Sequence, residues 1–199
     1  MASIENLFNV KEKNIFVTGA SSGLGRSAAT CLAEAGAKVV GIARRSDKLK
    51  EWSQKTKGKT SFYSADVSNR NEIKSIVEKI VKIEGYPDIL INAAGLNTRE
   101  HADDVTIEGW DKTLDLNLST PFFMAQAVIE EMKKQKWGRI INYGSLASRR
   151  ALPSSIAYGA SKGGIEQLTR AMAEAWSPYG INVNAIGPGF FPTELTEPV

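Results

Sequence analysis

Residues 14–25 read NIFVTGASSGLG. The first five residues are apolar, β-branched or aromatic for the most part, which favours a buried strand. The glycines that follow let the chain turn sharply before a helix. They would also let the backbone approach a pyrophosphate, whose charge is met by free N–H groups and the dipole at the helix N-terminus. The stretch therefore predicts a strand, a phosphate-binding loop and a helix.

The glycines of this loop have the spacing G-x-x-x-G-x-G. This differs from the G-x-G-x-x-G spacing typical of many dinucleotide-binding loops. The alternative is a glycine-rich turn between a strand and a helix that binds no ligand. If the loop does hold a phosphate, the candidate contacts are Gly19, Ser21, Ser22, Gly23, Leu24 and Gly25.

Outward from the loop, short apolar runs alternate with longer segments of helical periodicity. Strands are predicted at residues 14–18, 38–43, 60–65, 88–92, 139–143 and 182–186, and helices at 23–35, 47–56, 71–83, 106–134 and 156–176. Strands that are each followed by a helix or crossover form a parallel sheet with helices on both faces. We therefore predict a doubly wound, Rossmann-like α/β fold, in a single dinucleotide-binding catalytic domain that spans residues 1–199.

Local signals refine this prediction. Ser68 or Asn69 is placed to cap the helix at 71–83, with Glu72 in its first turn. Gly36 follows the first helix at the position where a left-handed residue commonly ends one. Cys31 lies in an apolar helical segment and is predicted to be a small core residue rather than a nucleophile.

The composition excludes several classes of protein. The chain has 199 residues, of which 42% are hydrophobic and 24% charged, and its formal net charge is +3. This charge is too weak to indicate nucleic-acid binding. The single cysteine excludes an internal disulfide, and no Cys/His cluster has zinc spacing, so no metal is predicted. No apolar run has the length of a membrane span and the N-terminus lacks a signal-peptide pattern, which predicts a cytoplasmic location.

The end of the second predicted strand indicates which dinucleotide the loop would hold. An acidic residue about twenty positions after the glycines usually binds the adenosine ribose, but Arg44 and Arg45 follow the strand instead. Guanidinium groups would bind a 2′-phosphate, with Arg44 as the predicted cofactor contact, which favours NADP(H) over NAD(H). The alternative is that one or both arginines are solvated surface charges. Further cofactor contacts are predicted at the next strand ends, at Asp66, Val67, Asn92, Ala93 and Gly95.

Tyr158 and Lys162 are one helical turn apart near the start of the last predicted helix, so their side chains share one face. A nearby ammonium stabilises a phenolate, and such a phenol exchanges protons with a carbonyl or alcohol oxygen near neutral pH. Ser145, just after the fifth strand, is placed to donate a hydrogen bond to the same oxygen. Taken alone, Y-x-x-x-K also occurs as a surface tyrosine beside a lysine.

Several motifs together resemble those of the short-chain dehydrogenase/reductase family in order and spacing. They are TGASSGLG at 18–25, NAAG at 92–95, LDLNL at 114–118, Ser145 thirteen residues before Tyr158, YGASK at 158–162 and PGFFPT at 188–193. The resemblance covers nearly the whole chain. It implies a catalytic tetrad in which Tyr158 is the acid/base and Ser145 orients the substrate. Lys162 would bind the nicotinamide ribose and the tyrosine, and Asn117 would hold a proton-relay water.

The resemblance also implies that Pro188, Gly189 and Thr193 flank the nicotinamide. Family members normally continue beyond this segment with a substrate-covering loop, another helix and a seventh strand. Because this chain stops at Val199, six strands are predicted, without the seventh strand and the substrate-covering region. The sixth strand is expected to be an uncovered edge.

The function implied by the resemblance is an NADP(H)-dependent interconversion of a ketone and a secondary alcohol by a homo-oligomer, a dimer or tetramer. Residues 95–104 and 116–127 are most similar to sugar-acid dehydrogenases of the family, which suggests a substrate such as 5-ketogluconate. The alternatives are a 3-oxoacyl carrier-protein reductase and a non-catalytic dinucleotide-binding sensor or scaffold. Substrate contacts are predicted at a basic rim around the pocket, formed by Arg99, Arg149 and Arg150, and at His101. The alternative for His101 is a solvated loop position.

Overall fold

The computed structural model describes residues 8–196, in which six strands form one parallel sheet with the order β3-β2-β1-β4-β5-β6. Neighbouring strands pair in parallel along the whole sheet. The order reverses between β1 and β4, so the crevice of a doubly wound fold lies at the carboxyl ends of these strands. The strands are β1 Asn14–Thr18, β2 Lys38–Ala43, β3 Lys59–Ser64, β4 Ile89–Asn92, β5 Gly138–Tyr143 and β6 Ile181–Ile186.

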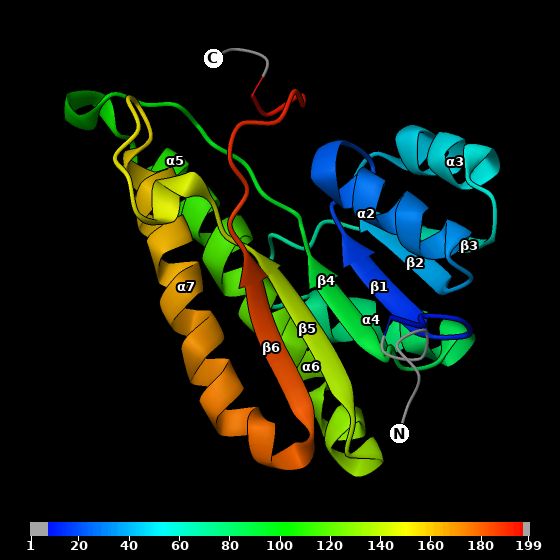
Figure 1. Ribbon diagram of the computed structural model, residues 1–199. Coiled ribbons are helices and arrows are strands. Elements are labelled where there is room, and N and C mark those ends of the chain that lie inside the picture. The colour runs from blue at the N-terminus through cyan, green and yellow to red at the C-terminus, as the bar shows by residue number, and fades with distance from the viewer. Residues whose placement is uncertain (1–7, 197–199) are drawn as a thin grey trace.

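Helices pack on both faces of the sheet, which confirms the predicted Rossmann-like architecture (Figure 1). One face packs against α2 Gly23–Glu34 and α3 Ser46–Lys55, through a core that includes Trp52. The other face packs against α4 Ile73–Glu84, α6 Thr120–Gln135 and α7 Ile156–Trp176. Within residues 8–196, no helix is long and apolar enough to cross a membrane.

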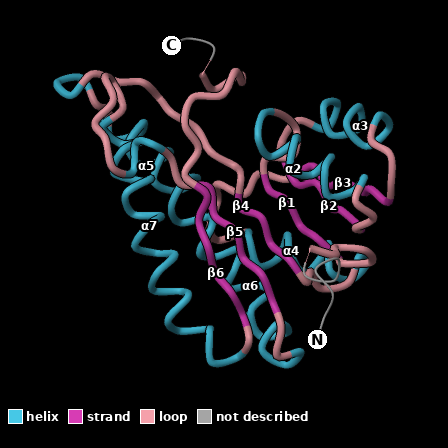
Figure 2. Tube along the Cα trace, viewed as in Figure 1, coloured by secondary structure: helices cyan, strands magenta, loops and turns pink. Residues whose placement is uncertain are grey.

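The two faces are covered unequally. On the side of α2, the part of the sheet formed by β5 and β6 has no helix of residues 8–196 over it (Figures 1 and 2). Alternate residues of β6, beginning with Asn182 and Asn184, are exposed there, whereas Ile181 and Val183 are buried on the opposite face. Within the described residues β6 ends the strand order and pairs with β5 alone, so it is an edge strand, as expected.

The predicted helix at 106–134 is wrong as a single element. The structure divides it into α5 Ile107–Leu114, a π-helical turn Asp115–Ser119, and α6. Pro121 lies in the first turn of α6 and has no N–H, so it cannot donate to the carbonyl of Asn117 four residues earlier. The regular ladder is therefore interrupted where the wider turn ends and α6 begins, which apolar periodicity alone does not show.

Of the two predicted helix ends, the one at Gly36 is confirmed and the one before α4 is wrong. Gly36 follows α2 with φ +93°, which confirms the left-handed position. The capping of α4 by Ser68 or Asn69 is wrong, because Glu72 occupies the N-cap position. Asn69 accepts a 3.2 Å hydrogen bond from the Asn71 N–H and donates a 2.8 Å hydrogen bond to the Glu72 carboxylate, forming a turn before the helix instead.

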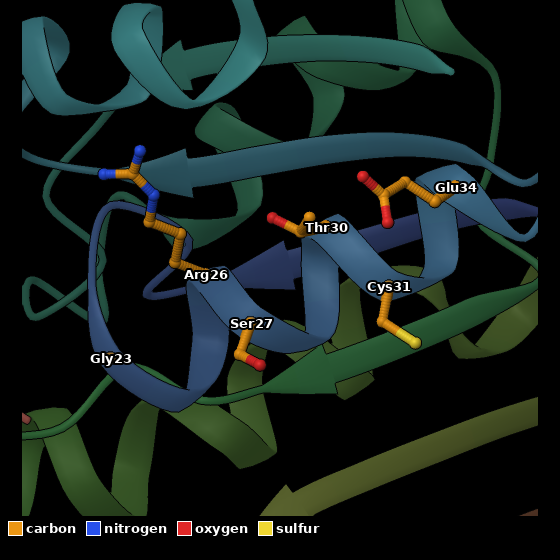
Figure 3. Close-up of a pocket in the computed structure, with 6 residues that line it drawn as sticks. All are labelled: Gly23, Arg26, Ser27, Thr30, Cys31 and Glu34. Carbon is orange, nitrogen blue, oxygen red and sulfur yellow. The ribbon is translucent and has the colours of Figure 1, made fainter. Parts of the chain in front are cut away.

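Cys31 is exposed, which corrects its prediction as a core residue. Ala29 and Ala33 face the sheet. Cys31 is two residues from each of them, about 200° around the helix, and therefore lies on the opposite side. Figure 3 shows the thiol on a hollow of about 450 Å³ along the outer face of α2. The hollow is lined by Gly23, Arg26, Ser27, Thr30, Cys31 and Glu34. It shares only Gly23 with the predicted site.

Candidate active site

The glycine loop lies against the end of β4. Gly19 has φ +76°, and a Cβ added there would be 2.8 Å from the amide nitrogen of Ala94. A Cβ on Gly25 would be 2.5 Å from the carbonyl oxygen of Gly19. The same Ala94 N–H donates a 3.2 Å hydrogen bond to the hydroxyl of Thr18 at the end of β1. The loop therefore fits only with glycine at these positions, and it joins the two strands that flank the crevice.

The start of α2 has the chemistry of an anion site. Ser22 occupies the N-cap position, but its hydroxyl makes no capping hydrogen bond, and the first turn carries no acidic residue. The backbone N–H groups of the first turn are therefore not capped by this side chain, and the positive end of the helix dipole lies beside the loop. This arrangement fits the pyrophosphate of a dinucleotide.

The two arginines after β2 have different positions. Arg45 Nη2 lies 2.6 Å from Ser22 Oγ and 3.2 Å from Ser21 Oγ, so this guanidinium contacts the glycine loop. Arg44 Nη1 instead lies 3.8 Å from a carboxylate oxygen of Asp66. Of the two arginines named from the sequence, Arg45 therefore has the position that the phosphate interpretation requires.

Asp66 lies at the same edge, just after β3. Burial opposes ionisation of its carboxyl, but hydrogen bonds from Ser68 and the charges of Arg44 and Lys112 outweigh it and lower the pKa of Asp66. Val67 is buried in the core, and its carbonyl accepts a 2.6 Å hydrogen bond from Thr120. Of these two predicted cofactor contacts, Asp66 presents a charged side chain to the crevice edge, while the Val67 side chain is buried in the core.

The end of β4 is tied to its neighbours by Asn92. This buried side chain donates 2.9 Å to the amide oxygen of Asn142 in β5 and 3.3 Å to the carbonyl of Pro121. Asn142 in turn donates 3.0 Å to Thr169 of α7. Asn92 therefore positions the strand from inside the core. The half-buried Ala93 follows it next to the glycine loop, since an added Cβ on Gly19 would lie 2.9 Å from its carbonyl.

Asn117 is held in the π-helical turn by three hydrogen bonds. Its amide oxygen accepts from the Leu96 N–H at 2.9 Å, and its amide nitrogen donates to the Leu96 carbonyl at 2.8 Å and to Ser161 Oγ at 3.1 Å. A Cβ added to Gly95 would lie 3.3 Å from the Asn117 amide oxygen and 3.8 Å from Lys162 Nζ. The predicted residues at 95, 117 and 162 are therefore brought together at one place.

Lys162 completes this cluster. Its side chain is only 5% exposed, and burial lowers the pKa of Lys162 to about 8. Its Nζ donates a 2.6 Å hydrogen bond to the carbonyl of Tyr143 and lies 5.7 Å from the centre of the Tyr158 ring. A buried ammonium beside a half-buried phenol is the pairing that the sequence predicted.

Ser145 is the N-cap of the short 3-10 helix Leu146–Ser148 that follows β5. Its hydroxyl accepts a 3.1 Å hydrogen bond from the Ala147 N–H. Ser148, the fourth residue of this capping box, donates 2.8 Å to the carbonyl of Lys162. The turn that carries Ser145 is thereby fastened to the part of α7 that carries Tyr158 and Lys162.

The segment after β6 connects the turn that carries Ser145 with the glycine loop. The Pro188 carbonyl accepts a 3.0 Å hydrogen bond from the Leu146 N–H, beside Ser145. Further along, the Thr193 side chain lies 3.6 Å from where a Cβ on Gly23 would be. The exposed Gly189 lies between them. Figure 1 shows this segment, in red, leaving β6 at the carboxyl end of the sheet. The predicted nicotinamide contacts therefore reach from the serine turn to the glycine loop.

The predicted basic rim is engaged with other parts of the protein. Arg99 has φ +57° and donates a 2.6 Å hydrogen bond to the Leu195 carbonyl. Arg149 donates 3.0 Å to Glu166 one turn after Lys162 on α7. His101 is exposed, with Nδ1 3.5 Å from an Asp103 carboxylate. The substrate contacts of Arg99, His101, Arg149 and Arg150 stay predictions.

Two residues of the site were not foreseen from the sequence. Ser161 holds the Asn117 amide, and it lies inside the YGASK motif, so the motif was its only signal. Glu194 pairs with Arg45, with 2.8 Å between Oε2 and Nη1. An acid after Thr193 has no local pattern that would have indicated this contact.

Comparison with known proteins identifies the family of this site. The family model of the short chain dehydrogenases matches residues 13–199. The chain belongs to the short-chain dehydrogenase family. It is therefore an NAD(P)-dependent oxidoreductase that acts on CH–OH groups of small molecules.

Similar proteins include several sugar and polyol enzymes. An NAD-dependent glycerol dehydrogenase of Listeria innocua is 40% identical over 188 residues, which are 94% of this chain and 74% of the relative. A 2-dehydro-3-deoxy-D-gluconate 5-dehydrogenase of Dickeya dadantii is 38% identical, covering 98% of this chain and 78% of its own length. The gluconate 5-dehydrogenase of Gluconobacter oxydans is 34% identical, with coverage of 96% and 76%.

The fold is also that of known short-chain dehydrogenases. A metagenomic short-chain oxidoreductase solved in complex with NADP is similar with a TM-score of 0.86 and 29% identity, over 92% of this chain and 84% of that one. A short-chain dehydrogenase from Streptomyces avermitilis has a TM-score of 0.86 and 29% identity, over 94% of this chain and 68% of that one.

Proposed function

We propose that this short-chain dehydrogenase interconverts a keto group and a secondary alcohol of a sugar acid, with NADP(H) as its cofactor and a gluconate such as 5-ketogluconate as its substrate. The observation that carries the proposal is the cluster at the carboxyl ends of β4 and β5. There Tyr158, Lys162 and Asn117 converge next to Gly95, on the same edge of the sheet as the glycine loop.

Each side chain has a part that its contacts support. Tyr158 passes a proton to or from the substrate oxygen, and the Lys162 ammonium lies 5.7 Å from the centre of its ring. Ser145 orients the substrate oxygen with its hydroxyl. Asn117, fixed by the Leu96 backbone, would hold a relay water in place. A nicotinamide dinucleotide on the glycine loop would supply or accept the hydride, held by the first turn of α2, Lys162 and the segment from Pro188 to Thr193.

The sugar-acid assignment is supported by the names of the gluconate and deoxygluconate relatives and by the basic side chains of Arg99, Arg149 and Arg150 near the site. A second candidate is the oxidation of a small polyol with NAD, because the glycerol dehydrogenase of Listeria innocua is 40% identical. The carrier-protein reductase stays the alternative within the family, whereas the family membership and the intact tyrosine and lysine argue against the non-catalytic sensor.

The preference for NADP(H) is supported by the contact of Arg45 with Ser21 and Ser22. A guanidinium and two hydroxyls beside the glycine loop are suitable donors for a 2′-phosphate. We expect Arg45→Ala to raise the KM for NADP by about tenfold or more and to leave the KM for NAD within about twofold.

The experiment that tests the function is a steady-state survey of substrates with both cofactors. The panel holds gluconate and 5-ketogluconate, glycerol, and an acetoacetyl thioester, each with NADP(H) and NAD(H). Turnover of the sugar acids with the phosphorylated cofactor supports the proposal. Turnover of glycerol with NAD alone would favour the polyol enzyme, and turnover of the thioester would favour the carrier-protein reductase.

A homo-oligomer and a cytoplasmic location complete the proposal. Large apolar side chains begin both α5 and α7, where Ile107 is 83% and Ile156 47% exposed. These two helices pack together, so the exposed residues form part of a surface that a second copy would bury. Light scattering at micromolar concentration is expected to show a dimer or tetramer, and a monomer would contradict it.

A further inference from the structure

The segment Thr193–Thr196 lies beside the glycine loop and contacts three other parts of the chain. The Thr193 side chain lies against Gly23. Glu194 pairs with Arg45, from the loop after β2, and the Leu195 carbonyl accepts from Arg99, from the loop after β4. The segment thereby connects both sides of the crevice at the place where a dinucleotide would lie.

The contact between Glu194 and Arg45 occupies donors that a phosphate would use. Arg45 directs Nη1 to the Glu194 carboxylate at 2.8 Å and Nη2 to Ser22 Oγ at 2.6 Å and Ser21 Oγ at 3.2 Å. The hydrogen bond from Arg45, with smaller effects of Ser22 and Lys48, lowers the pKa of Glu194. Glu194 is therefore a carboxylate at neutral pH, bound where an oxyanion of the cofactor is expected.

We propose that Glu194 is a cofactor-discriminating residue, whose carboxylate competes with the adenosine 2′-phosphate for Arg45. The inference rests on the proposed binding of that phosphate by Arg45. NADP(H) must displace the carboxylate and then lies beside its negative charge, whereas NAD(H) has no group that needs the guanidinium. Glu194 thus lowers the advantage that Arg45 gives to the phosphorylated cofactor, because specificity depends on repulsive as well as attractive groups.

The effect is modest because the pair is half-exposed. The Arg45 side chain is 43% exposed and the Glu194 side chain 53% exposed. Exposed ion pairs are screened by water and salt and are weak. We therefore expect removal of the carboxylate to change phosphate affinity on the order of two- to fivefold at low ionic strength.

The experiment measures two small probes by calorimetry, adenosine 2′,5′-bisphosphate and 5′-AMP, on the whole 199-residue chain. The variants are Glu194→Gln, Arg45→Ala and the control Glu12→Gln. Glu12 pairs with Lys59 at 2.9 Å at the amino end of the sheet, so its substitution changes the net charge equally but away from the crevice. We expect Glu194→Gln to tighten the bisphosphate about two- to fivefold without changing 5′-AMP, and Glu12→Gln to change neither.

Three results would overturn the inference. The first is an unchanged or weaker affinity of Glu194→Gln for the bisphosphate. The second is an equal gain for both probes, and the third is an equal gain in Glu12→Gln, either of which would show a general charge effect. The Arg45→Ala variant tests the proposed function separately. If this substitution weakens the binding of the bisphosphate no more than the binding of 5′-AMP, the assignment of the 2′-phosphate to Arg45 is wrong, whatever the result with Glu194→Gln. Circular dichroism confirms that each variant is folded.

Discussion

The Lys162 ammonium lies 5.7 Å from the centre of the Tyr158 ring, one turn along α7. It is fixed there by its 2.6 Å hydrogen bond to the Tyr143 carbonyl and by burial. The lysine is 5% exposed and the tyrosine half-buried, so the ammonium and the ring meet away from bulk water. The pair therefore joins α7 to the end of β5 at the place where the proposed proton transfer would occur.

The first prediction concerns the proton itself. Tyr158→Phe keeps the ring and removes the hydroxyl, so turnover is expected to fall by about 10²–10⁴-fold. Cofactor affinity, measured by calorimetry, is expected to stay within about twofold because the glycine loop and Arg45 are unchanged. Tyr143→Phe is the matched control, since it removes a phenol from the end of β5. A Tyr158→Phe variant with more than a tenth of the normal rate would contradict the assigned role.

The second prediction concerns the cost of burying Lys162. Its pKa falls from 10.5 to about 8 by burial, so between these values the unfolded chain binds more protons than the folded one, and stability rises with pH. Below about pH 8 the full free-energy cost of burying the charged lysine is present. Lys162→Met removes it together with one hydrogen bond, so we expect the variant to be more stable at pH 7 by about 1–3 kcal/mol.

Urea unfolding at several pH values measures this effect. The advantage of Lys162→Met over the unsubstituted protein is expected to shrink as the pH rises from 8 toward 10.5. A variant that is less stable at pH 7, or whose difference does not depend on pH, would show that the lysine is not buried at a cost. The variant is expected to be inactive, which illustrates how a functional site retains a destabilising group.

The third prediction concerns the π-helical turn. Asn117→Ala removes all three hydrogen bonds of the amide and leaves the N–H and carbonyl of Leu96 without these partners. Unpaired buried polar groups are expensive, and we expect a loss of about 2–4 kcal/mol in the free energy of unfolding. Asn71→Ala, at an exposed position before α4, is the control and should change stability by less than about 0.5 kcal/mol.

Much of this structure follows from local sequence. The six strands and the glycine loop are encoded by short runs of adjacent residues, and Tyr158 and Lys162 meet because helical geometry places them one turn apart. The π-helical turn was missed because its cause is a single missing N–H at Pro121, which leaves the apolar period almost unchanged. Cys31 was misplaced because an apolar segment was taken for a buried position.

Other features depend on distant parts of the chain. Arg45 and Glu194 are 149 residues apart, so no window of sequence contains both. The sequence likewise predicts Arg44 as the phosphate contact, whereas Arg45 is the one that reaches the loop, because that depends on how the chain leaves β2. Contacts of this kind are set by the topology of the sheet, which brings the carboxyl ends of its strands to one edge.

The last prediction compares two glycines of the loop. Gly19 and Gly23 both have positive φ, +76° and +55°, so alanine at either position carries a backbone cost of about 1–2 kcal/mol. They differ in the space for a side chain. At Gly19 a Cβ would lie 2.8 Å from the Ala94 amide nitrogen, whereas at Gly23 its nearest neighbour would be the Thr193 side chain at 3.6 Å.

Gly19→Ala must therefore push the loop away from β4, in addition to the backbone cost that both variants share. We expect Gly19→Ala to lower the unfolding free energy by at least about 1 kcal/mol more than Gly23→Ala in urea. Equal losses in the two variants would mean that the close approach of the loop to β4 does not restrict the residue at position 19.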